Sequence, residues 1–336
     1  MTDFTSETIA AENEIHGPRP ERWYARLDRE REQLNQALRK WLEHDIARGL
    51  ELAGAVWPFW GARGHVPEGR EWLSRLLAAA PAAVRSAGRA KALYGAGTLA
   101  FIQGERNAAY PLHEESLAIA RELGNRGLEA DALIGLARVA LLDLDAVKME
   151  EMARASRTAA VAAGDPGRVA TALHHVAEAL RRQRRYKEVL PLYHESIEVH
   201  SALGNRRGVA LELHNLGNVA RLTGDSESAA LKFRESLTLA RELLNRRLAA
   251  YCLLGLAHLA VGRGDWSQAA RCLGASDSLF AEAGVALDPD YREDQVRTRS
   301  ACESALGPPT FAAELAAGAV LGLEAGGEPT VRSPQS

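Results

Sequence analysis

Apolar residues are spaced as on one face of an α-helix along most of the chain, and residues 210–243 show this pattern most clearly. Residues 210–222 and 229–240 each carry leucine, alanine or other apolar residues three and four positions apart, the spacing of a helix with one buried face. Thr223-Gly224-Asp225 separates the two stretches. Glycine can take the left-handed conformation that ends a helix, and aspartate can cap the next one. The pattern predicts a helical hairpin.

The same pattern returns every forty residues. Two sets of residues share this period, a serine series and a series of small residues midway along each first segment: Ser116, Ser156, Ser196, Ser236 and Ser276, and Gly97, Ala137, Ala177, Gly217 and Ala257. A fixed period of this length is typical of stacked supersecondary units, and we expect the serines to be small packing contacts between helices. Hairpins are predicted at residues 93–104 with 107–123, 130–142 with 147–163, 170–182 with 186–203, within 210–243, and at 249–262 with 266–283. A more divergent hairpin is expected at residues 50–77.

The predicted organisation is a stack of about six hairpins over residues 49–284, closed by helices at both ends. Residues 1–18 are expected to be a disordered tail and residues 19–48 a capping helix. Residues 285–323 are expected to form C-terminal capping helices, and residues 324–336 a second disordered tail. Pro58 should kink or end the helix that contains it. Trp57–Trp60 and Trp72 are interpreted as the core of the first hairpin, with a partner-binding patch as the alternative.

Charge and cysteine content limit the classes of partner and the cellular compartment that fit this chain. The formal net charge of −3 argues against a nucleic-acid backbone as the main partner. The three cysteines lie inside helical patterns and fit a reducing compartment better than a disulfide framework. The first residues lack the pattern of a secretory signal, and the most apolar stretch, residues 311–323, is too short to span a bilayer. We therefore expect a cytoplasmic protein that does not contact membranes.

Three residues of the clearest hairpin carry a family resemblance. Gly217, Ala229 and Phe233 match the small residue, the alanine and the aromatic residue of tetratricopeptide repeats, and other hairpins match in part. The hairpin with Met149 and Ala153 is the weakest match. This resemblance implies an all-α, right-handed superhelical solenoid of tetratricopeptide hairpins, with a period of about forty residues. It also implies that the first helices line a concave surface that holds the ligand.

A second resemblance is to the repeat region of bacterial STAND-type regulators, many of which end in a LuxR-type DNA-binding domain. Residues 34–43, 57–60 and 68–73 carry it. No lysine follows a glycine, so the chain has no phosphate-binding loop of the G-x-x-x-x-G-K-[ST] type. Residues 27–34 superficially resemble the start of a LuxR-type domain, but no turn and recognition helix follow. The resemblance implies the sensor or scaffold arm of a regulator whose other domains lie outside this chain.

The predicted ligand surface consists of polar side chains on successive first helices: Tyr94, Thr98, Arg138, His174, Glu178, Arg181, His214, Asn218, Arg221 and His258. Arginine, histidine and asparagine could hold a carboxylate or phosphate by charge-assisted hydrogen bonds. Alternatively, these residues merely keep an exposed groove solvated. His174, Glu178 and His214 could in principle bind a metal ion, but adjacent repeat helices hold them too far apart. We expect no metal and no cofactor.

The function expected from the sequence is non-catalytic recognition of a protein or peptide, with a small effector as a further option. A fragment of a transcriptional regulator is the alternative, and an enzyme using a histidine-lined groove is least favoured because no nucleophile motif is present. No direct nucleic-acid partner is expected. Residues 181–185, the densest positive run, could dock an acidic partner or simply end a helix. Within this run, Arg184 occupies the position that Gly224 and Gly264 hold in sister hairpins.

Overall fold

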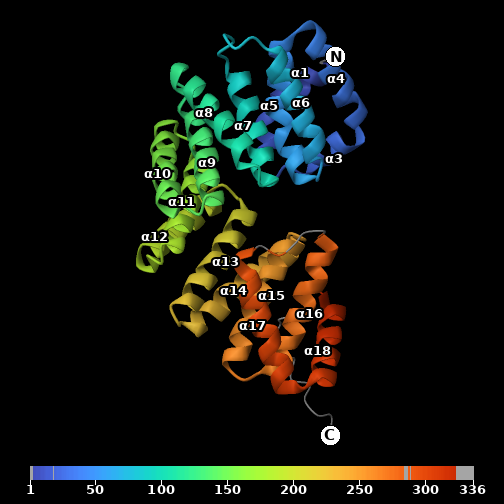
Figure 1. The fold of residues 1–336 in the computed structure, drawn as a ribbon, viewed down its shortest axis with the longest axis vertical. Coiled ribbons are helices and arrows are strands. Elements are labelled where there is room, and N and C mark those ends of the chain that lie inside the picture. Colours follow the sequence, from blue (N-terminus) through green and yellow to red (C-terminus); the bar gives the residue numbers. More distant parts are fainter. Residues whose placement is uncertain (1–2, 18, 284–286, 288, 323–336) are drawn as a thin grey trace. The chain divides into compact units, whose positions relative to one another are not determined.

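The computed structural model describes residues 3–17, 19–283, 287 and 289–322, and these residues form eighteen helices and no strand. The chain divides into two compact units, Met1–Asn205 (unit 1) and Arg206–Ser336 (unit 2), which are described separately (Figure 1). The helices of unit 1 are α1 (Phe4–Ala10), α2 (Glu12–Ile15), α3 (Glu21–Arg29), α4 (Arg31–His44), α5 (Ile46–Ala62), α6 (Val66–Ala79), α7 (Ala87–Ile102), α8 (Arg106–Glu122), α9 (Arg126–Leu142), α10 (Ala146–Ala162), α11 (Pro166–Arg182) and α12 (Tyr186–Ala202). Those of unit 2 are α13 (Arg206–Leu222), α14 (Ser226–Glu242), α15 (Arg246–Gly262), α16 (Trp266–Ala283), α17 (Pro289–Leu306) and α18 (Pro308–Leu321).

The predicted hairpins are present, but their first helices begin three to six residues earlier than the apolar pattern suggests. Asn125, Asp165 and Asn245 cap α9, α11 and α15, and each side chain accepts a hydrogen bond from a backbone N–H three residues later. Such a cap satisfies one of the free N–H groups at a helix start. The first turns that follow are polar, which explains why apolar spacing alone places these starts too late.

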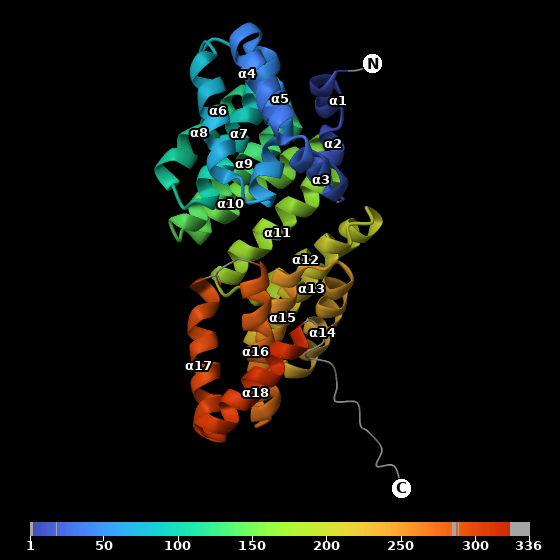
Figure 2. The same ribbon diagram turned by 90° about the vertical axis from the view of Figure 1, so that its right-hand side faces the viewer.

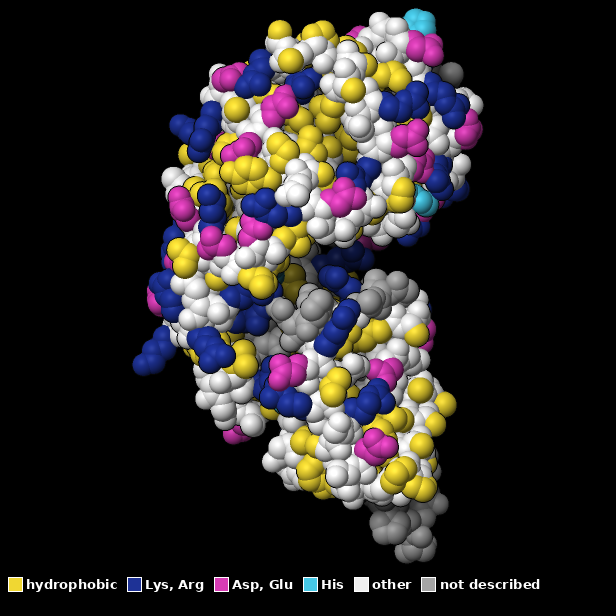
Figure 3. Space-filling model, in the orientation of Figure 1, with side chains coloured by type: hydrophobic (Ala, Val, Ile, Leu, Met, Phe, Trp, Pro, Cys, Tyr) yellow, Lys and Arg dark blue, Asp and Glu magenta, His cyan; other side chains and the backbone are white. Residues whose placement is uncertain are grey.

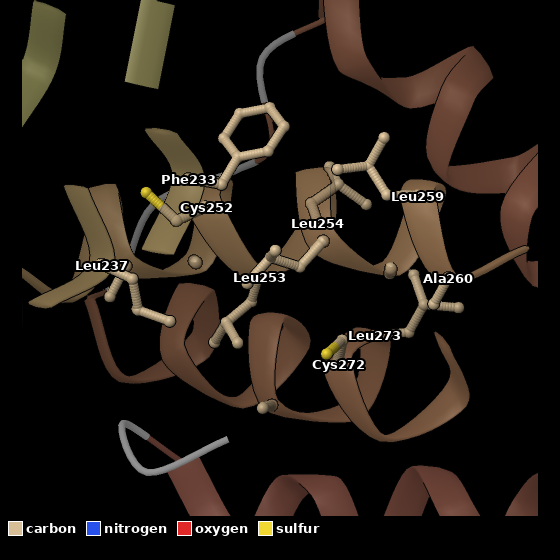
Figure 4. Packing of buried hydrophobic residues seen from close by; sticks show 14 of the residues in the cluster. Phe233, Leu237, Cys252, Leu253, Leu254, Leu259, Ala260, Cys272 and Leu273 are labelled. Carbon is tan, nitrogen blue, oxygen red and sulfur yellow. The ribbon is translucent and has the colours of Figure 1, made fainter. Parts of the chain in front are cut away.

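An aromatic ring wedged between two glycines holds the best-matching hairpin together. Phe233 of α14 is fully buried and lies between Gly217 of α13 and Gly255 of α15. A Cβ added at Gly217 would be 2.8 Å from the Phe233 ring, and one added at Gly255 would be 2.6 Å from it. Figure 4 shows this ring within the apolar core that α14, α15 and α16 share. The small residues of the repeat are therefore required by the close approach of the ring.

In unit 1, a histidine occupies the same place. The His113 side chain of α8 is fully buried between Gly97 of α7 and Gly135 of α9, where added Cβ atoms would come within 2.7 Å and 2.2 Å of the imidazole. The His113 ring thus occupies the repeat position of Phe233, three forty-residue periods earlier in the chain. Neither of its nitrogens meets hydrogen-bond geometry with a described residue. Burial, followed by the positive charge of Arg138, lowers the pKa of His113 to about 3.

The N-terminal segment differs from the expectation of a disordered tail over residues 1–18, since residues 4–15 form α1 and α2. Ile15 is fully buried, the Trp41 indole N–H donates to the Thr5 hydroxyl (2.8 Å), and Lys91 on α7 pairs with Glu12 (2.6 Å). Both helices are short, so their order comes from these tertiary contacts and not from helix propensity.

Two further expectations for the first hairpins need correction. The capping helix predicted at residues 19–48 is divided into α3 and α4 at Glu30, whose φ of −100° and ψ of 20° interrupt the helix. Pro58 does not end its helix, because α5 runs through it to Ala62. Phe59 and Trp60 directly after it are fully buried, and this packing keeps the segment helical despite the hydrogen bond that proline cannot form.

In unit 2, α18 stacks directly on α16. A Cβ added at Gly274 of α16 would be 2.0 Å from the Leu315 carbonyl oxygen, and one added at Gly318 would be 1.9 Å from that of Arg271. The two backbones therefore touch. The intervening helix α17 lies against α15 and α16 (Figures 1 and 2). Two helices lie within the range 285–323 that was expected to form C-terminal capping helices, whereas the tail predicted at residues 324–336 lies outside the described residues.

Candidate functional site

The predicted ligand residues fall into two groups, one in each unit. Tyr94, Thr98, Arg138, His174, Glu178 and Arg181 lie on α7, α9 and α11, and we call them the unit-1 face. His214, Asn218, Arg221 and His258 lie on α13 and α15, and we call them the unit-2 face. The structure gives these two faces different surroundings.

Aromatic rings form one end of the unit-1 face. The Tyr94 ring makes an edge contact with Trp57 (centroids 5.4 Å apart) and a tilted contact with His113 (5.5 Å). Burial raises the pKa of the Tyr94 hydroxyl, whereas the Arg138 charge opposes that shift. Thr98 is buried, so it does not line an open surface. Tyr94 is therefore the member of this end that remains partly exposed.

Arg138 is held by a neutral histidine. Its Nε donates to His175 Nε2 (3.4 Å), and His175 Nδ1 lies 2.9 Å from the Thr171 carbonyl oxygen. Because a carbonyl only accepts, the imidazole proton is on Nδ1 and the Nε2 lone pair faces Arg138. Burial, followed by the charge of Arg138, lowers the pKa of His175 to about 3. Arg138 forms no ion pair with a described residue, so it keeps an uncompensated charge.

The other charges on this side of unit 1 are paired. Glu178 accepts hydrogen bonds from Arg181 (2.6 Å and 3.0 Å) and from Arg182 (3.0 Å). Burial alone would raise the pKa of Glu178, but Arg181 and Arg182 hold it at about 2. His174 stacks edge-on against His175 with ring centroids 5.2 Å apart. Arg181 is therefore neutralised by Glu178, and Arg138 differs from it in having no carboxylate.

Sequence reasoning missed two groups that shape this face. Arg168 on α11 binds Asp131 on α9 through two hydrogen bonds (2.9 Å and 2.8 Å), which tie adjacent first helices together. The second group is His175, which orients Arg138. The forty-residue register could have placed Asp131 on this face, because Asp131 shares its repeat position with Lys91 and Thr171.

The unit-2 face is covered by α17. Asn218 donates to His214 Nε2 (2.8 Å) and to the Tyr291 hydroxyl (3.2 Å). Arg221 pairs with Asp294 at 3.0 Å, and His258 Nδ1 lies 2.9 Å from the Thr298 hydroxyl. His214 and Asn218 are 3% and 4% exposed.

These four residues, expected to line a concave ligand surface, are thus contacted by a helix of the same chain. Sequence reasoning missed the α17 residues because they lie beyond the last complete repeat. Burial, followed by the charge of Arg221, lowers the pKa of His258. Because the Thr298 hydroxyl donates to the Asp294 carbonyl oxygen (2.7 Å), the imidazole proton is on Nδ1 and His258 donates to Thr298.

Other chemistry finds little support among the residues that the structure describes. They contain no group of three His, Cys, Asp or Glu side chains arranged to bind a metal ion. Burial raises the pKa of Cys252 and Cys272 to about 12, so neither thiol is a nucleophile at neutral pH. No helix in the described ranges has the length and apolar character needed to cross a bilayer. On the face shown in Figure 3, Lys and Arg side chains are interspersed with Asp and Glu side chains.

Comparison with known proteins supports the repeat assignment. The tetratricopeptide repeat family model matches residues 168–242, and no curated protein sequence gives a significant match. A Rap protein complexed with Competence and Sporulation Factor is similar in structure, with a TM-score of 0.60 and 13% identity over 95% of this chain and 94% of that one. NprR in complex with its cognate peptide NprX has a TM-score of 0.56 and 14% identity, covering 93% and 86% of the two chains.

A third similar structure is BtubC from P. vanneervenii, with a TM-score of 0.51 and 18% identity over 74% of this chain and 96% of that one. At these identities the likeness is one of fold. The resemblance to STAND and LuxR-type regulators stays a prediction. The family match at residues 168–242, the forty-residue hairpins and the wedged Phe233 and His113 agree, so the chain contains tetratricopeptide repeats within an all-α solenoid fold.

Proposed function

We propose that this chain is a non-catalytic binding protein that captures a peptide, or a peptide segment of a protein, on the unit-1 face. The observation that carries the proposal is Arg138, a partly buried guanidinium that a neutral histidine orients and that no carboxylate among the described residues neutralises. A positioned cation of this kind favours a carboxylate ligand, since charge-assisted hydrogen bonds are about twice as strong as neutral ones. Tyr94 offers an aromatic surface nearby, within range of the Arg138 charge.

Two of the similar structures support a peptide as the ligand class. The Rap protein was solved with Competence and Sporulation Factor, and NprR with its cognate peptide NprX. In the present chain, an acidic side chain or a C-terminal carboxylate would pair with Arg138, and an adjacent apolar residue would pack on Tyr94. A small effector with a carboxylate is the second candidate, because the same cation would bind it.

We favour recognition over catalysis for this chain. Aspartyl phosphate phosphatase F from Bacillus subtilis is also similar in structure, with a TM-score of 0.55 and 12% identity, but that likeness concerns the fold. The buried thiols of Cys252 and Cys272 are protonated at neutral pH. A role as the detached sensor arm of a transcriptional regulator is compatible with peptide capture. Three buried free cysteines fit a reducing compartment, so we place the protein in the cytoplasm.

The test is selection of peptides from a displayed random library, followed by fluorescence anisotropy with the selected peptides. Arg138→Gln should weaken binding at least tenfold, whereas the matched change Arg157→Gln on α10, whose arginine already pairs with Glu195 (2.7 Å), should leave it unchanged. Equal affinity of wild type and Arg138→Gln would refute the proposed site. Selected peptides should carry an acidic residue or end in a required free carboxylate.

A further inference from the structure

Helix α17 is an insertion in the stack of helices that forms unit 2. The close crossing of Gly274 and Gly318 places α18 directly on α16, as a first helix follows a second helix elsewhere in the repeats. The stack is thus continued by α18, and α17 packs beside it against α15, α16 and α18. Helix α17 instead lies on the side of α13 and α15 where the polar residues of the unit-2 face are found.

The contacts of α17 with α13 and α15 follow one stripe of the helix. Tyr291, Asp294 and Thr298 are three and four positions apart, which places them on the same side. Tyr291 meets the His214–Asn218 pair, Asp294 meets Arg221, and Thr298 meets His258. The opposite side of the helix is exposed, with Val296 61% accessible. This is the arrangement of a helical ligand in a groove.

Polar and apolar contacts share this attachment, because Tyr291 also packs on the Tyr251 ring (centroids 4.9 Å apart) and Cys302 belongs to the apolar core of unit 2. Thr298 is 2% exposed and Cys302 is fully buried, while the ion pair of Arg221 and Asp294 retains 16% and 21% side-chain exposure. An external helix that reproduces these polar and apolar contacts recovers the stabilisation that is lost when α17 leaves. An exchange of α17 for a ligand making equivalent contacts therefore costs little.

The same contacts define which ligand could replace α17. Removing Asp294 leaves Arg221 partly buried without its carboxylate, and the donors of Asn218 lose the Tyr291 hydroxyl. Leaving such groups unpaired is costly, so a helix without these acceptors would be rejected. The face selects an aromatic hydroxyl, a carboxylate three residues later and a hydroxyl four residues after that.

We propose that the unit-2 face is a second, helix-binding site closed by α17, and that an external helical peptide with an aromatic residue, Asp or Glu at i+3 and Ser or Thr at i+7 displaces α17. This inference is independent of peptide capture on the unit-1 face. Helix α17 competes with any external helix for the unit-2 face, so a partner must bind this face with a higher affinity than α17 does.

The probe for the test is a fluorescein-labelled synthetic peptide of residues 289–306 of this chain. In the full-length protein, the double change Asp294→Asn and Thr298→Ala weakens the resident α17 but leaves α13 and α15 intact. The labelled peptide should bind this variant at least tenfold more tightly than wild type. Glu293→Gln, at a neighbouring side chain that is 82% exposed, is the matched control and should behave as wild type. A probe with Asn in place of the residue corresponding to Asp294 should bind the double variant at least tenfold more weakly.

Hydrogen exchange monitored by mass spectrometry provides the second readout and does not depend on variants. In wild type, a saturating excess of the peptide should speed exchange in α17 while α13 and α15 stay protected. Equal binding of the peptide to wild type and to the folded double variant, or unchanged exchange in α17 at saturation, would overturn the proposal. Arg138→Gln should leave binding of this probe unchanged, so failure at one face is distinguished from failure at the other.

Discussion

The Ser236 hydroxyl donates a 2.7 Å hydrogen bond to the Ala210 carbonyl oxygen, across the two helices of one hairpin. The same bond spans 26 residues in three further hairpins, at 2.8 Å to 2.9 Å: Ser116 to Ala90, Ser156 to Ala130, and Ser276 to Ala250. The serine period therefore reflects a hydrogen bond between helices as well as the small size of the residue.

Ser236→Ala should lower the free energy of unfolding by about 0.5–1.5 kcal/mol, the usual net value of a buried hydrogen bond. Denaturant unfolding followed by circular dichroism measures this change. Ser226→Ala, at an exposed serine of the same helix, is the control and should stay within about 0.5 kcal/mol of wild type. Equal stability of the two variants would mean that the serine is retained for its size alone.

Gly217→Leu should destabilise unit 2 by about 1–3 kcal/mol, because the new side chain would overlap the Phe233 ring. Gly262→Leu makes the same chemical change at the end of α15, where an added Cβ meets nothing within 4 Å, and should have little effect. A comparison of thermal midpoints suffices. An unchanged midpoint for Gly217→Leu would contradict the wedged arrangement.

His113→Phe should stabilise unit 1 by about 1–3 kcal/mol at neutral pH, since it removes buried nitrogens without hydrogen-bond geometry. Phe233 between Gly217 and Gly255 shows that a phenyl ring fits such a site. The variant should also respond less to acid. In wild type, the folded state keeps His113 neutral down to about pH 3, whereas the unfolded chain takes up a proton near pH 6.5.

The unfolded state therefore binds more protons between these two pH values, and wild-type stability falls as pH drops from 6.5 towards 3. One such histidine contributes a slope of about 1.4 kcal/mol per pH unit. His113→Phe should remove that share while the contribution of His175, with its similar pKa of about 3, remains. Unfolding curves at several pH values measure the slope, and identical slopes for wild type and variant would show that His113 is protonated in the folded state.

Arg184→Gly should stabilise unit 1 by up to about 1 kcal/mol. Arg184 has φ of 59°, in the left-handed region that the equivalent residues Gly224 and Gly264 occupy. A side chain in this region costs about 1–2 kcal/mol. Glycine avoids that cost, but it also raises the conformational entropy of the unfolded chain, which offsets part of the gain. Leu144→Gly, at φ 57°, should behave alike. Leu190→Gly, inside α12, is the contrasting control and should destabilise. Loss of stability in Arg184→Gly would indicate that its side chain makes a compensating contact.

The sequence predicted the parts of this fold that are repeated. Gly217, Ala229 and Phe233 were sufficient to set the register, because each position recurs and its spacing reports helix packing directly. The order of α1 and α2 could not be predicted, since Ile15 and Thr5 belong to segments too short to show a helical period. Their structure depends on partners such as Trp41, more than thirty residues away.

The candidate sites were predictable only in part, for a similar reason. Position in the repeat placed Arg138 and Arg221 on the correct side of their helices, but position does not determine what lies opposite them. Asp294 and Thr298 carry no periodic signal, so their placement against Arg221 and His258 follows from tertiary folding alone. His175 orients Arg138 through a tautomer that no sequence pattern specifies.

The position of Phe233 also bears on how such a chain changes length during evolution. Its ring touches a glycine of its own hairpin and a glycine of the next, so every junction of this kind uses the same pair of surfaces. Duplication or deletion of one forty-residue gene segment would rejoin equivalent surfaces, whereas an insertion of a few residues inside a hairpin would shift one glycine away from the ring. Recombination between repeats can therefore lengthen or shorten the protein in whole hairpins without a new core having to be selected.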